Sequence, residues 1–271
     1  MSAIDDLFAR LKSEQRKALM PFITAGDPNI EATGVILERL AAAGADLAEI
    51  GIPYSDPVAD GPVIQASYQR ALDHGFRLQQ AFQLGQDKAA GLGMPLVTMV
   101  SYAIIYRVGL QEYVRRAKAA GYAGAIVPDL LVEEADELSK ICRDEDFSLI
   151  QLVTPTTPRE RQVQIANSSS GFLYYVSVTG ITGERNELPA DLLESVRWLR
   201  GQTELPICIG FGISGADIAA KLAPVADGLI VGSAVVRRIA EHPEAVDAAD
   251  AVAKFVAELR AAIDSVASAA S

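Results

Sequence analysis

The chain has 271 residues, of which 50% are hydrophobic, so it can bury a core of the size found in one α/β barrel and does not require two domains. A formal net charge of −11 would repel nucleic-acid phosphates and acidic lipids, so neither nucleic acid nor a membrane is an expected partner. The cysteines, Cys142 and Cys208, are far apart and show no CxxC spacing. This predicts no disulfide framework and no thiolate metal site, and it fits a reducing cytoplasm.

The chain begins with an amphipathic segment, Ser2 to Lys12. Ile4, Leu7, Phe8 and Leu11 recur there at helical spacing between charged residues, whereas a signal peptide would need an uninterrupted apolar core. We therefore expect an extra helix ahead of the first strand. No stretch reaches the roughly 20 uninterrupted apolar residues of a membrane helix, so a soluble protein is expected.

Short apolar runs then alternate with longer amphipathic stretches, which is typical of parallel strands joined by helices that cover the sheet. The eight runs are Ala18 to Ala25, Asp46 to Ile52, Pro95 to Tyr102, Gly124 to Pro128, Ser148 to Thr154, Gly171 to Val178, Pro206 to Phe211, and Asp227 to Gly232. Eight units favour closure, so the predicted fold is α/β, a single (β/α)8 TIM barrel domain over residues 1–271. From the pattern alone an open doubly wound sheet remains an alternative, although no run carries the charges expected of an exposed edge strand.

The last segment, Val246 to Ile263, places Val252, Phe255 and Leu259 on one helical face. This spacing predicts a helix that closes the barrel. The tail, Asp264 to Ser271, is expected to fray.

Glu49 is the first candidate for chemistry. In barrels of this class the active site gathers at the carboxyl ends of the strands, and Glu49 lies near the end of the second run. Strand alternation puts Leu47, Glu49 and Gly51 on one face, while the other face, with Ile50, must meet the helices. Glu49 therefore points into the barrel, where burial without a partner would raise its pKa and suit it to proton transfer near neutral pH. A buried ion pair or a structural hydrogen bond is the alternative for such an acid.

Two aspartates, Asp56 and Asp60, lie in the loop Pro53 to Pro62, which follows this strand and is rich in proline and glycine. Asp-Pro and Asp-Gly-Pro are also common turn sequences, and Pro62 suits the first turn of a helix. Taken alone, each aspartate is therefore predicted to be a turn former.

Glycine-rich loops follow the sixth, seventh and eighth runs. Gly210-Phe-Gly-Ile-Ser-Gly215 and Gly232-Ser233 match the place where barrels bind phosphate through backbone N–H groups and a helix amino terminus. The alternative is that Gly212 permits a tight turn and Ser214 caps a helix. Two such elements after the last two strands favour phosphate, and Thr179-Gly-Ile-Thr-Gly183 is predicted to complete the pocket or to close over it.

The two histidines, His74 and His242, are too few and too isolated for a catalytic triad or a histidine metal centre. Both are predicted to be structural. The chain holds no P-loop, which argues against a nucleotide as the phosphate ligand.

Six motifs run in order along nearly the whole chain. They are Pro21-Phe-Ile-Thr-Ala-Gly-Asp-Pro28, Glu49-Ile-Gly-Ile-Pro-Tyr-Ser-Asp-Pro-Val-Ala-Asp-Gly-Pro62, Val127-Pro-Asp-Leu130, Thr179-Gly-Ile-Thr-Gly183, Gly210-Phe-Gly-Ile-Ser214 and Gly232-Ser-Ala234. Together they resemble the tryptophan synthase α subunit family, and the second motif is the most specific. The resemblance implies a lyase that cleaves indole 3-glycerol phosphate to indole and glyceraldehyde 3-phosphate in tryptophan biosynthesis, with no metal or organic cofactor required.

The resemblance also implies the roles of individual residues. Glu49 would be the acid/base that protonates the indole C3, and Asp60 would accept a hydrogen bond from the indole N–H. For Asp60 the resemblance therefore favours a role in the reaction over a role as a turn former. Thr182 would belong to a mobile loop that helps to position Asp60. The remaining implied substrate contacts are a phosphate site at Gly183, Gly212, Gly232 and Ser233 and an apolar indole slot near Phe22, Tyr102, Leu130 and Tyr175.

A partner is implied as well, since the family works as two α and two β subunits and passes indole to the β subunit. Asp56 would lie in the loop that faces this partner. One position departs from the family: Ile104 stands where an asparagine is usual, two positions after Tyr102. An apolar residue there is expected to leave catalysis untouched and to alter the details of docking.

Three other interpretations remain open. A free-standing indole 3-glycerol phosphate lyase would have the same fold and chemistry without an obligate partner. A catalytically silent barrel could activate a partner, but the presence of both Glu49 and Asp60 argues against it. Another sugar-phosphate barrel enzyme, such as an isomerase, would explain the glycine loops but not the block Glu49 to Pro62.

Overall fold

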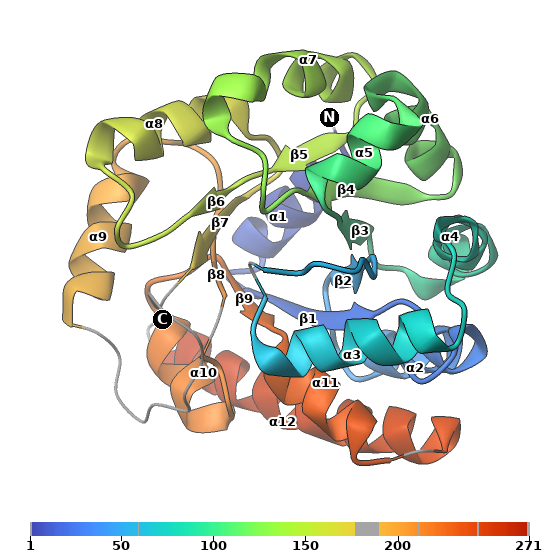
Figure 1. The fold of residues 1–271 in the computed structure, drawn as a ribbon. Helices are drawn as coiled ribbons and strands as arrows, with labels where there is room; N and C mark the ends of the chain where they lie inside the picture. Colours follow the sequence, from blue (N-terminus) through green and yellow to red (C-terminus); the bar gives the residue numbers. More distant parts are fainter. Residues whose placement is uncertain (1, 59, 177–189, 211, 243, 270–271) are drawn as a thin grey trace.

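The structure is a computed structural model that describes residues 2–58, 60–176, 190–210, 212–242 and 244–269, and its strands form one parallel sheet surrounded by helices (Figure 1). The strands are β1 (Ala18–Thr24), β2 (Ala48–Gly51), β3 (Leu96–Met99), β4 (Tyr122–Ile126), β5 (Ser148–Ile150), β6 (Leu152–Val153), β7 (Leu173–Val176), β8 (Ile207–Gly210) and β9 (Gly228–Val231). The helices are α1 (Ala3–Ser13), α2 (Ile30–Ala42), α3 (Pro62–Asp73), α4 (Leu78–Leu92), α5 (Tyr102–Val108), α6 (Leu110–Ala119), the 3-10 turn η1 (Val132–Glu134), α7 (Asp136–Asp144), α8 (Arg159–Ser168), α9 (Ala190–Arg200), α10 (Ala216–Leu222), α11 (Ser233–Ala240) and α12 (Ala245–Ala269). None of the helices in the described ranges is long and apolar enough to cross a membrane.

The barrel closes through the fifth predicted run. The sheet order is β5-β4-β3-β2-β1-β9-β8-β7-β6, so the two strands at its ends are consecutive in the chain and separated only by Gln151. β5 pairs with β4 and β6 pairs with β7, and the carbonyl of Gln151 accepts a hydrogen bond from the Tyr174 N–H at 3.2 Å. One run thus serves both ends of the sheet. The predicted (β/α)8 barrel with an extra N-terminal helix is confirmed, with the fifth run divided into two short strands.

The third predicted run ends earlier than expected. β3 stops at Met99, and Tyr102 begins α5 instead of ending a strand. Ser101 is the N-cap of this helix, and the Asp129 carboxylate accepts hydrogen bonds from the Ser101 hydroxyl at 2.6 Å and from the Tyr102 N–H at 2.7 Å. A capped helix start satisfies backbone groups that a longer strand would have had to pair.

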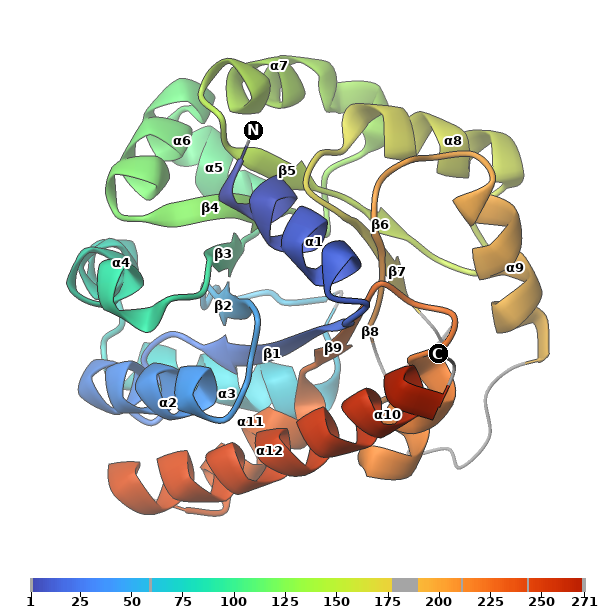
Figure 2. The ribbon, with the colours of Figure 1, turned by 180° about the vertical axis from the view of Figure 1, so that it is seen from behind.

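The core has two layers, one inside the barrel and one between the barrel and its helices. We call them the inner core and the outer core, and their members come from alternate positions along the strands. Helix α1 crosses the amino-terminal end of the barrel (Figure 2) and closes the inner core there with the buried side chains of Ile4, Leu7, Phe8 and Leu11. The predicted apolar face of this segment therefore covers the amino-terminal end of the barrel, and the carboxyl ends of the strands remain available for an active site.

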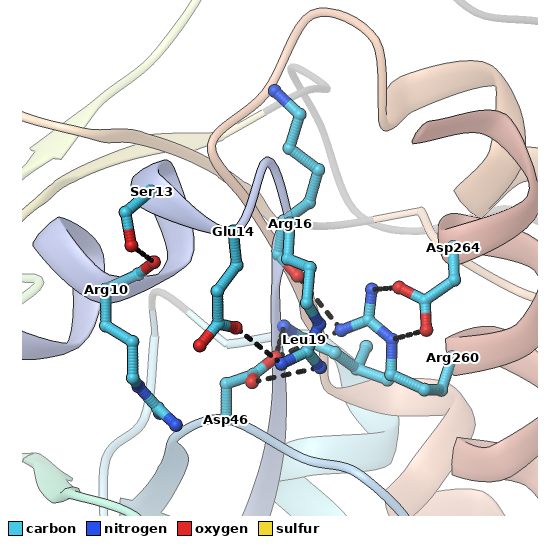
Figure 3. Close-up of polar contacts among 9 residues, drawn as sticks. Arg10, Ser13, Glu14, Arg16, Leu19, Asp46, Arg260 and Asp264 are labelled. Carbon is cyan, nitrogen blue, oxygen red and sulfur yellow. Dashed lines mark hydrogen bonds and ion pairs between the residues drawn. The ribbon is translucent and has the colours of Figure 1, made fainter. Parts of the chain in front are cut away.

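At the end of the barrel where the strands begin, an ion pair between Asp46 and Arg260 joins the start of β2 to α12 (Figure 3). Asp46 accepts hydrogen bonds from the Leu19 N–H at 2.9 Å and from Arg260 at 3.0 Å, and Arg260 also donates to the Lys17 carbonyl at 2.9 Å. Burial raises the pKa of Asp46, while the Leu19 N–H and Arg260 oppose the rise. Asp264 accepts two more hydrogen bonds from Arg260, at 3.0 and 2.6 Å. Helix α12 is held at Asp264 by these bonds and runs to Ala269, and fraying of the tail stays a prediction.

We expect Arg260→Met to lower the free energy of unfolding by about 3 kcal/mol, because the buried Asp46 carboxylate loses its closest cation. The Arg39–Asp250 pair also joins α12 to another helix, but its side chains are 52% and 59% exposed. Arg39→Met is therefore the matched control and should cost less than about 1 kcal/mol. Urea unfolding followed by circular dichroism measures both losses, and equal losses would contradict a special contribution from the buried pair.

Candidate active site

Glu49 lies in β2 with its side chain in the barrel interior, as strand alternation predicted. It is in register with Phe22 of β1 and Val97 of β3, which belong to the inner core, while Ala48 and Ile50 belong to the outer core. Glu49 is 0% exposed, and among the described residues neither of its carboxylate oxygens has a hydrogen-bond partner. Burial raises the pKa of Glu49 well above its ordinary value and so favours the protonated acid.

Two tyrosine hydroxyls lie beyond Glu49, toward the carboxyl ends of the strands. Tyr68 of α3 and Tyr174 of β7 belong to the inner core, and burial together with nearby acid charge raises the pKa of each well above its ordinary value. The hydroxyls occupy the space that a side chain would take at Gly51 and Gly210, the last residues of β2 and β8. Glycine at these two positions therefore makes room for protonated hydrogen-bond donors at the mouth of the barrel.

Asp60 lies in the loop between β2 and α3, within electrostatic reach of Tyr68 and Tyr174. Burial and the neighbouring Asp129 raise the pKa of Asp60 to about 6. Tyr54, on the same loop, responds to the same surroundings, since burial, Asp60 and Asp129 raise its pKa to about 12. The fold thus brings the two predicted acids to one end of the barrel, where each binds its proton more tightly than in water.

Asp129 is a neighbour of the site to which the sequence analysis gave no role, although it lies in the motif Val127-Pro-Asp-Leu130. It follows β4, and its carboxylate is fixed by the hydroxyl of Ser101 and the N–H of Tyr102. In the sequence it is one more aspartate after a proline, which is ordinary turn chemistry. Its place after a strand of the barrel is the signal that could have selected it.

The loops after β8 and β9 carry the glycines predicted to bind phosphate. Gly212 has a φ of +80°, a left-handed conformation that favours glycine. Gly232 is the N-cap of α11, whose first residue is Ser233, and a Cβ at 232 would lie 3.7 Å from the Cβ of Phe22. The first N–H groups of a helix have no partner within the helix and attract anions. An anion bound there would lie beside Phe22.

The residues predicted to form the indole slot are only partly brought together. Phe22 belongs to the inner core, but Leu130 and Tyr175 belong to the outer core, and Tyr102 packs against the outer core from the first turn of α5. Along β7, alternation turns Tyr174 inward and Tyr175 toward the helices. The structure therefore corrects the placement of Tyr102, Leu130 and Tyr175, and Tyr174 is the inward residue of β7 that the sequence analysis missed.

The remaining predictions concern the two histidines, a possible metal site, and residues that lie outside the described ranges. His74 is the C-cap of α3, and the Nδ1 atom of His242 lies 2.8 Å from the Arg238 carbonyl, so both fit structural roles. Thr182 and Gly183 lie outside the described residues. Across the residues that are described, no group of three or more His, Cys, Asp or Glu side chains is arranged to hold a metal ion.

The arrangement defines what the site can do chemically. A protonated Glu49 can deliver a proton, an ionised Asp60 can accept a hydrogen bond, and both lie beside apolar side chains and loops suited to an anion. Fold and site together are those of a (β/α)8 barrel enzyme suited to acid–base chemistry on a substrate with an apolar part and an anionic part.

Comparisons with known proteins identify the family. A family model described as tryptophan synthase alpha chain matches residues 8–266. A tryptophan synthase alpha chain from Rhodopirellula baltica is 61% identical over 276 residues, which cover 97% of this chain and 99% of the relative. Among solved structures, tryptophan synthase subunit alpha from Legionella pneumophila strain Paris is 35% identical with a TM-score of 0.89, covering 98% of this chain and 99% of that chain. A tryptophan synthase structure from Mycobacterium tuberculosis is 30% identical with a TM-score of 0.88, covering 97% of this chain and 98% of that chain. The chain therefore belongs to the tryptophan synthase alpha chain family.

Membership in this family confirms the predicted reaction. The chain is a lyase of tryptophan biosynthesis that cleaves indole 3-glycerol phosphate to indole and glyceraldehyde 3-phosphate. Membership of this family also implies a tryptophan synthase β subunit as partner. The isomerase interpretation is excluded.

Proposed function

We propose that Glu49 is the acid/base of this cleavage and that Asp60 accepts a hydrogen bond from the indole N–H. The observation that supports this most directly is the state of Glu49, which is fully buried without a hydrogen-bond partner among the described residues. A buried acid with a structural role would be paired or hydrogen-bonded, because an unpaired one destabilises the fold. An unpaired acid that points into the barrel interior, two residues before the carboxyl end of its strand, is instead available to a substrate bound there.

The chemistry then proceeds in two stages. The proton of Glu49 goes to C3 of the indole ring, and Asp60 stabilises the positive charge that this creates at the ring nitrogen. The bond between C3 and the glycerol carbon then breaks, and its electron pair returns to the ring. The hydroxyl on that carbon becomes the aldehyde of glyceraldehyde 3-phosphate as its proton passes to the Glu49 carboxylate, which restores the acid for the next cycle.

The rest of the substrate is bound on the two sides of Phe22. The phosphate lies against the main chain of Gly212 and Gly232 and the start of α11 at Ser233, with Gly183 completing the site and Thr182 helping to position Asp60. Support for the described part comes from the left-handed Gly212 and from the helix start beside Phe22. The indole ring packs on Phe22 and Tyr174, which share the inner core. No metal or organic cofactor enters this scheme.

The proposal is tested by cleavage of indole 3-glycerol phosphate by the purified chain, followed as released indole, with and without a cognate β subunit. We expect weak activity alone and a large rise with the partner. Strong activity that the β subunit does not change would favour a free-standing lyase, and no activity under either condition would contradict the assigned roles.

We also propose where the β subunit binds. Val58, Tyr106 and Leu131 are 91%, 71% and 54% exposed, and they follow β2, β3 and β4, which are neighbours in the sheet. Exposed apolar side chains that gather on one face are typical of an interface. Asp56 is exposed in the first of these loops, and Ile104 lines an adjoining apolar groove, so its departure from asparagine fits an apolar contact. We further propose that two α chains and two β chains form the complex, that it is located in the cytoplasm, and that each α chain is a single domain.

We expect Tyr106→Ser to weaken binding of the β subunit by about tenfold or more, because it removes an exposed aromatic anchor from this face. Cleavage by the isolated chain should not change, since Tyr106 lies outside the inner core. Titration calorimetry with the β subunit measures the loss. Val246→Ser is the matched control, because Val246 is 56% exposed but lies on α12. Unchanged binding by Tyr106→Ser would place the partner on another face.

A further inference from the structure

Gln65, near the start of α3, has a side chain to which the scheme above gives no role. Its amide nitrogen donates hydrogen bonds to two main-chain carbonyls of the preceding loop, that of Asp60 at 2.7 Å and that of Pro57 at 3.2 Å. The N–H of Asp60 in turn donates a hydrogen bond to the Pro57 carbonyl at 3.1 Å. The Gln65 amide therefore closes a ring of hydrogen bonds that holds Asp60 at both its N–H and its carbonyl.

These two bonds connect the Asp60 end of the loop to the rest of the protein. Across residues 53–58 and 60, the described part of the loop, no other hydrogen bond reaches a described residue outside it. The ring of Tyr54 packs on that of Tyr68 with a centroid distance of 5.7 Å, but Tyr54 lies at the opposite end of the loop. Gly61, which joins Asp60 to α3, has no side chain that could cap the helix. Close to Asp60, the Gln65 amide is thus the one side-chain contact that fixes the described main chain.

Helix α3, which carries Gln65, is itself fixed to the barrel. The hydroxyl of Ser67 lies 2.6 Å from that of Thr24 in β1, and both residues are buried. Further along the helix, Arg70 donates two hydrogen bonds to the buried Asp27, at 2.8 and 2.7 Å. A group that positions another must itself be held by packing and hydrogen bonds, and the helix beneath Gln65 meets that condition.

On the basis of the role proposed for Asp60, we propose that Gln65 is a positioning residue of this reaction: its amide fixes the main chain of Asp60 and so directs the carboxylate toward the indole N–H. The direction of a side chain follows from the main chain that carries it, and a displacement of about 1 Å can lower a rate about 10²-fold. Gln65 is exposed, so water competes for its hydrogen bonds and their contribution to stability is small. Loss of the amide should therefore slow the reaction and leave the fold intact.

The test is Gln65→Met, which keeps the length of the side chain and removes its donor. Cleavage of indole 3-glycerol phosphate is measured with a cognate β subunit at a saturating concentration, so that a change in its binding does not alter the rate. We expect kcat to fall about tenfold while KM changes less than about twofold. Gln69→Met is the matched control, because Gln69 is exposed on the same helix and its amide donates to Asp73, at 2.7 Å, instead of to the loop. It should leave kcat unchanged.

A double-mutant cycle with Asp60→Ala separates positioning from a general effect on structure. Once the carboxylate is removed, Gln65 has no acid to position, so Gln65→Met should lower kcat by less than about twofold in the Asp60→Ala background. An unchanged kcat in Gln65→Met alone, or an equal loss in both backgrounds, would overturn the proposal. If Gln65→Met does not fold, Gln65→Ala also removes the amide, favours a helix, and is judged by the same cycle. Full cleavage by Asp60→Ala would instead defeat the role assigned to Asp60.

Discussion

Glu49→Gln is expected to reduce cleavage of indole 3-glycerol phosphate by about 10²- to 10⁴-fold, the usual contribution of a general acid or base. Glutamine has nearly the shape of glutamic acid but cannot deliver a proton to the indole C3. Released indole measured at saturating substrate gives the loss in kcat. Because Glu49 makes no hydrogen bond to the described residues, the fold should be unchanged by circular dichroism. Full activity in this variant would remove Glu49 from the mechanism.

The same substitution should also change the pH dependence of stability. Burial raises the pKa of Glu49 in the folded protein above the ordinary value of 4.5, so the folded state holds this proton more tightly than the unfolded chain does. The contribution of Glu49 to stability is therefore fully present below pH 4.5 and is lost as the pH rises through the folded pKa. Glu49→Gln, which never ionises, should melt at the same temperature as the unsubstituted protein at pH 4 and at a higher temperature at pH 8. Equal melting temperatures at pH 8 would show that Glu49 has a stabilising partner.

Asp60→Asn is expected to reduce kcat/KM by about 10²- to 10³-fold, because an amide oxygen carries no charge to stabilise the positive charge that develops at the indole nitrogen. Asp60 must be ionised to act, and its pKa is raised to about 6 by burial and by Asp129. In the unsubstituted protein kcat/KM should therefore fall below about pH 6, and this acid limb should be absent from the residual activity of Asp60→Asn.

Asp129 offers a sharper check on the same limb. Its negative charge raises the pKa of Asp60, so Asp129→Asn should move the acid limb of kcat/KM to lower pH. Asp144→Asn, which changes an aspartate that is 67% exposed on α7, is the control and should leave the limb where it is. An acid limb that stays near pH 6 in Asp129→Asn would mean that a group other than Asp60 controls it.

Much of the site follows from the sequence because the relevant rules are local. The period of two along a strand was enough to turn Glu49 inward, and position relative to the strand ends was enough to select the loops that hold Asp60, Gly212 and Gly232. The spacing of Ile4 to Leu11 likewise predicted α1. The order of the motifs along the chain was sufficient for the family and its reaction.

Other features depended on contacts between residues far apart in the chain. Alternation states that Tyr174 and Tyr175 face opposite ways, but only the pairing of β7 with its neighbours decides that Tyr174 is the inward one. The division of one run at Gln151 to close the barrel depends on two different partner strands.

The same reason applies to the donors around the acids. The hydroxyl of Tyr68 fills the space left at Gly51, and Asp129, which follows β4, accepts hydrogen bonds from the start of α5 after the neighbouring strand β3. Neither contact has a sequence signature. The periodicity of a helix shows which of its faces is apolar, but it does not show how far a side chain on that face reaches into the barrel. Tertiary packing alone decided which groups surround Glu49 and Asp60 and how deeply each acid is buried, and burial is the main cause of the raised pKa of both.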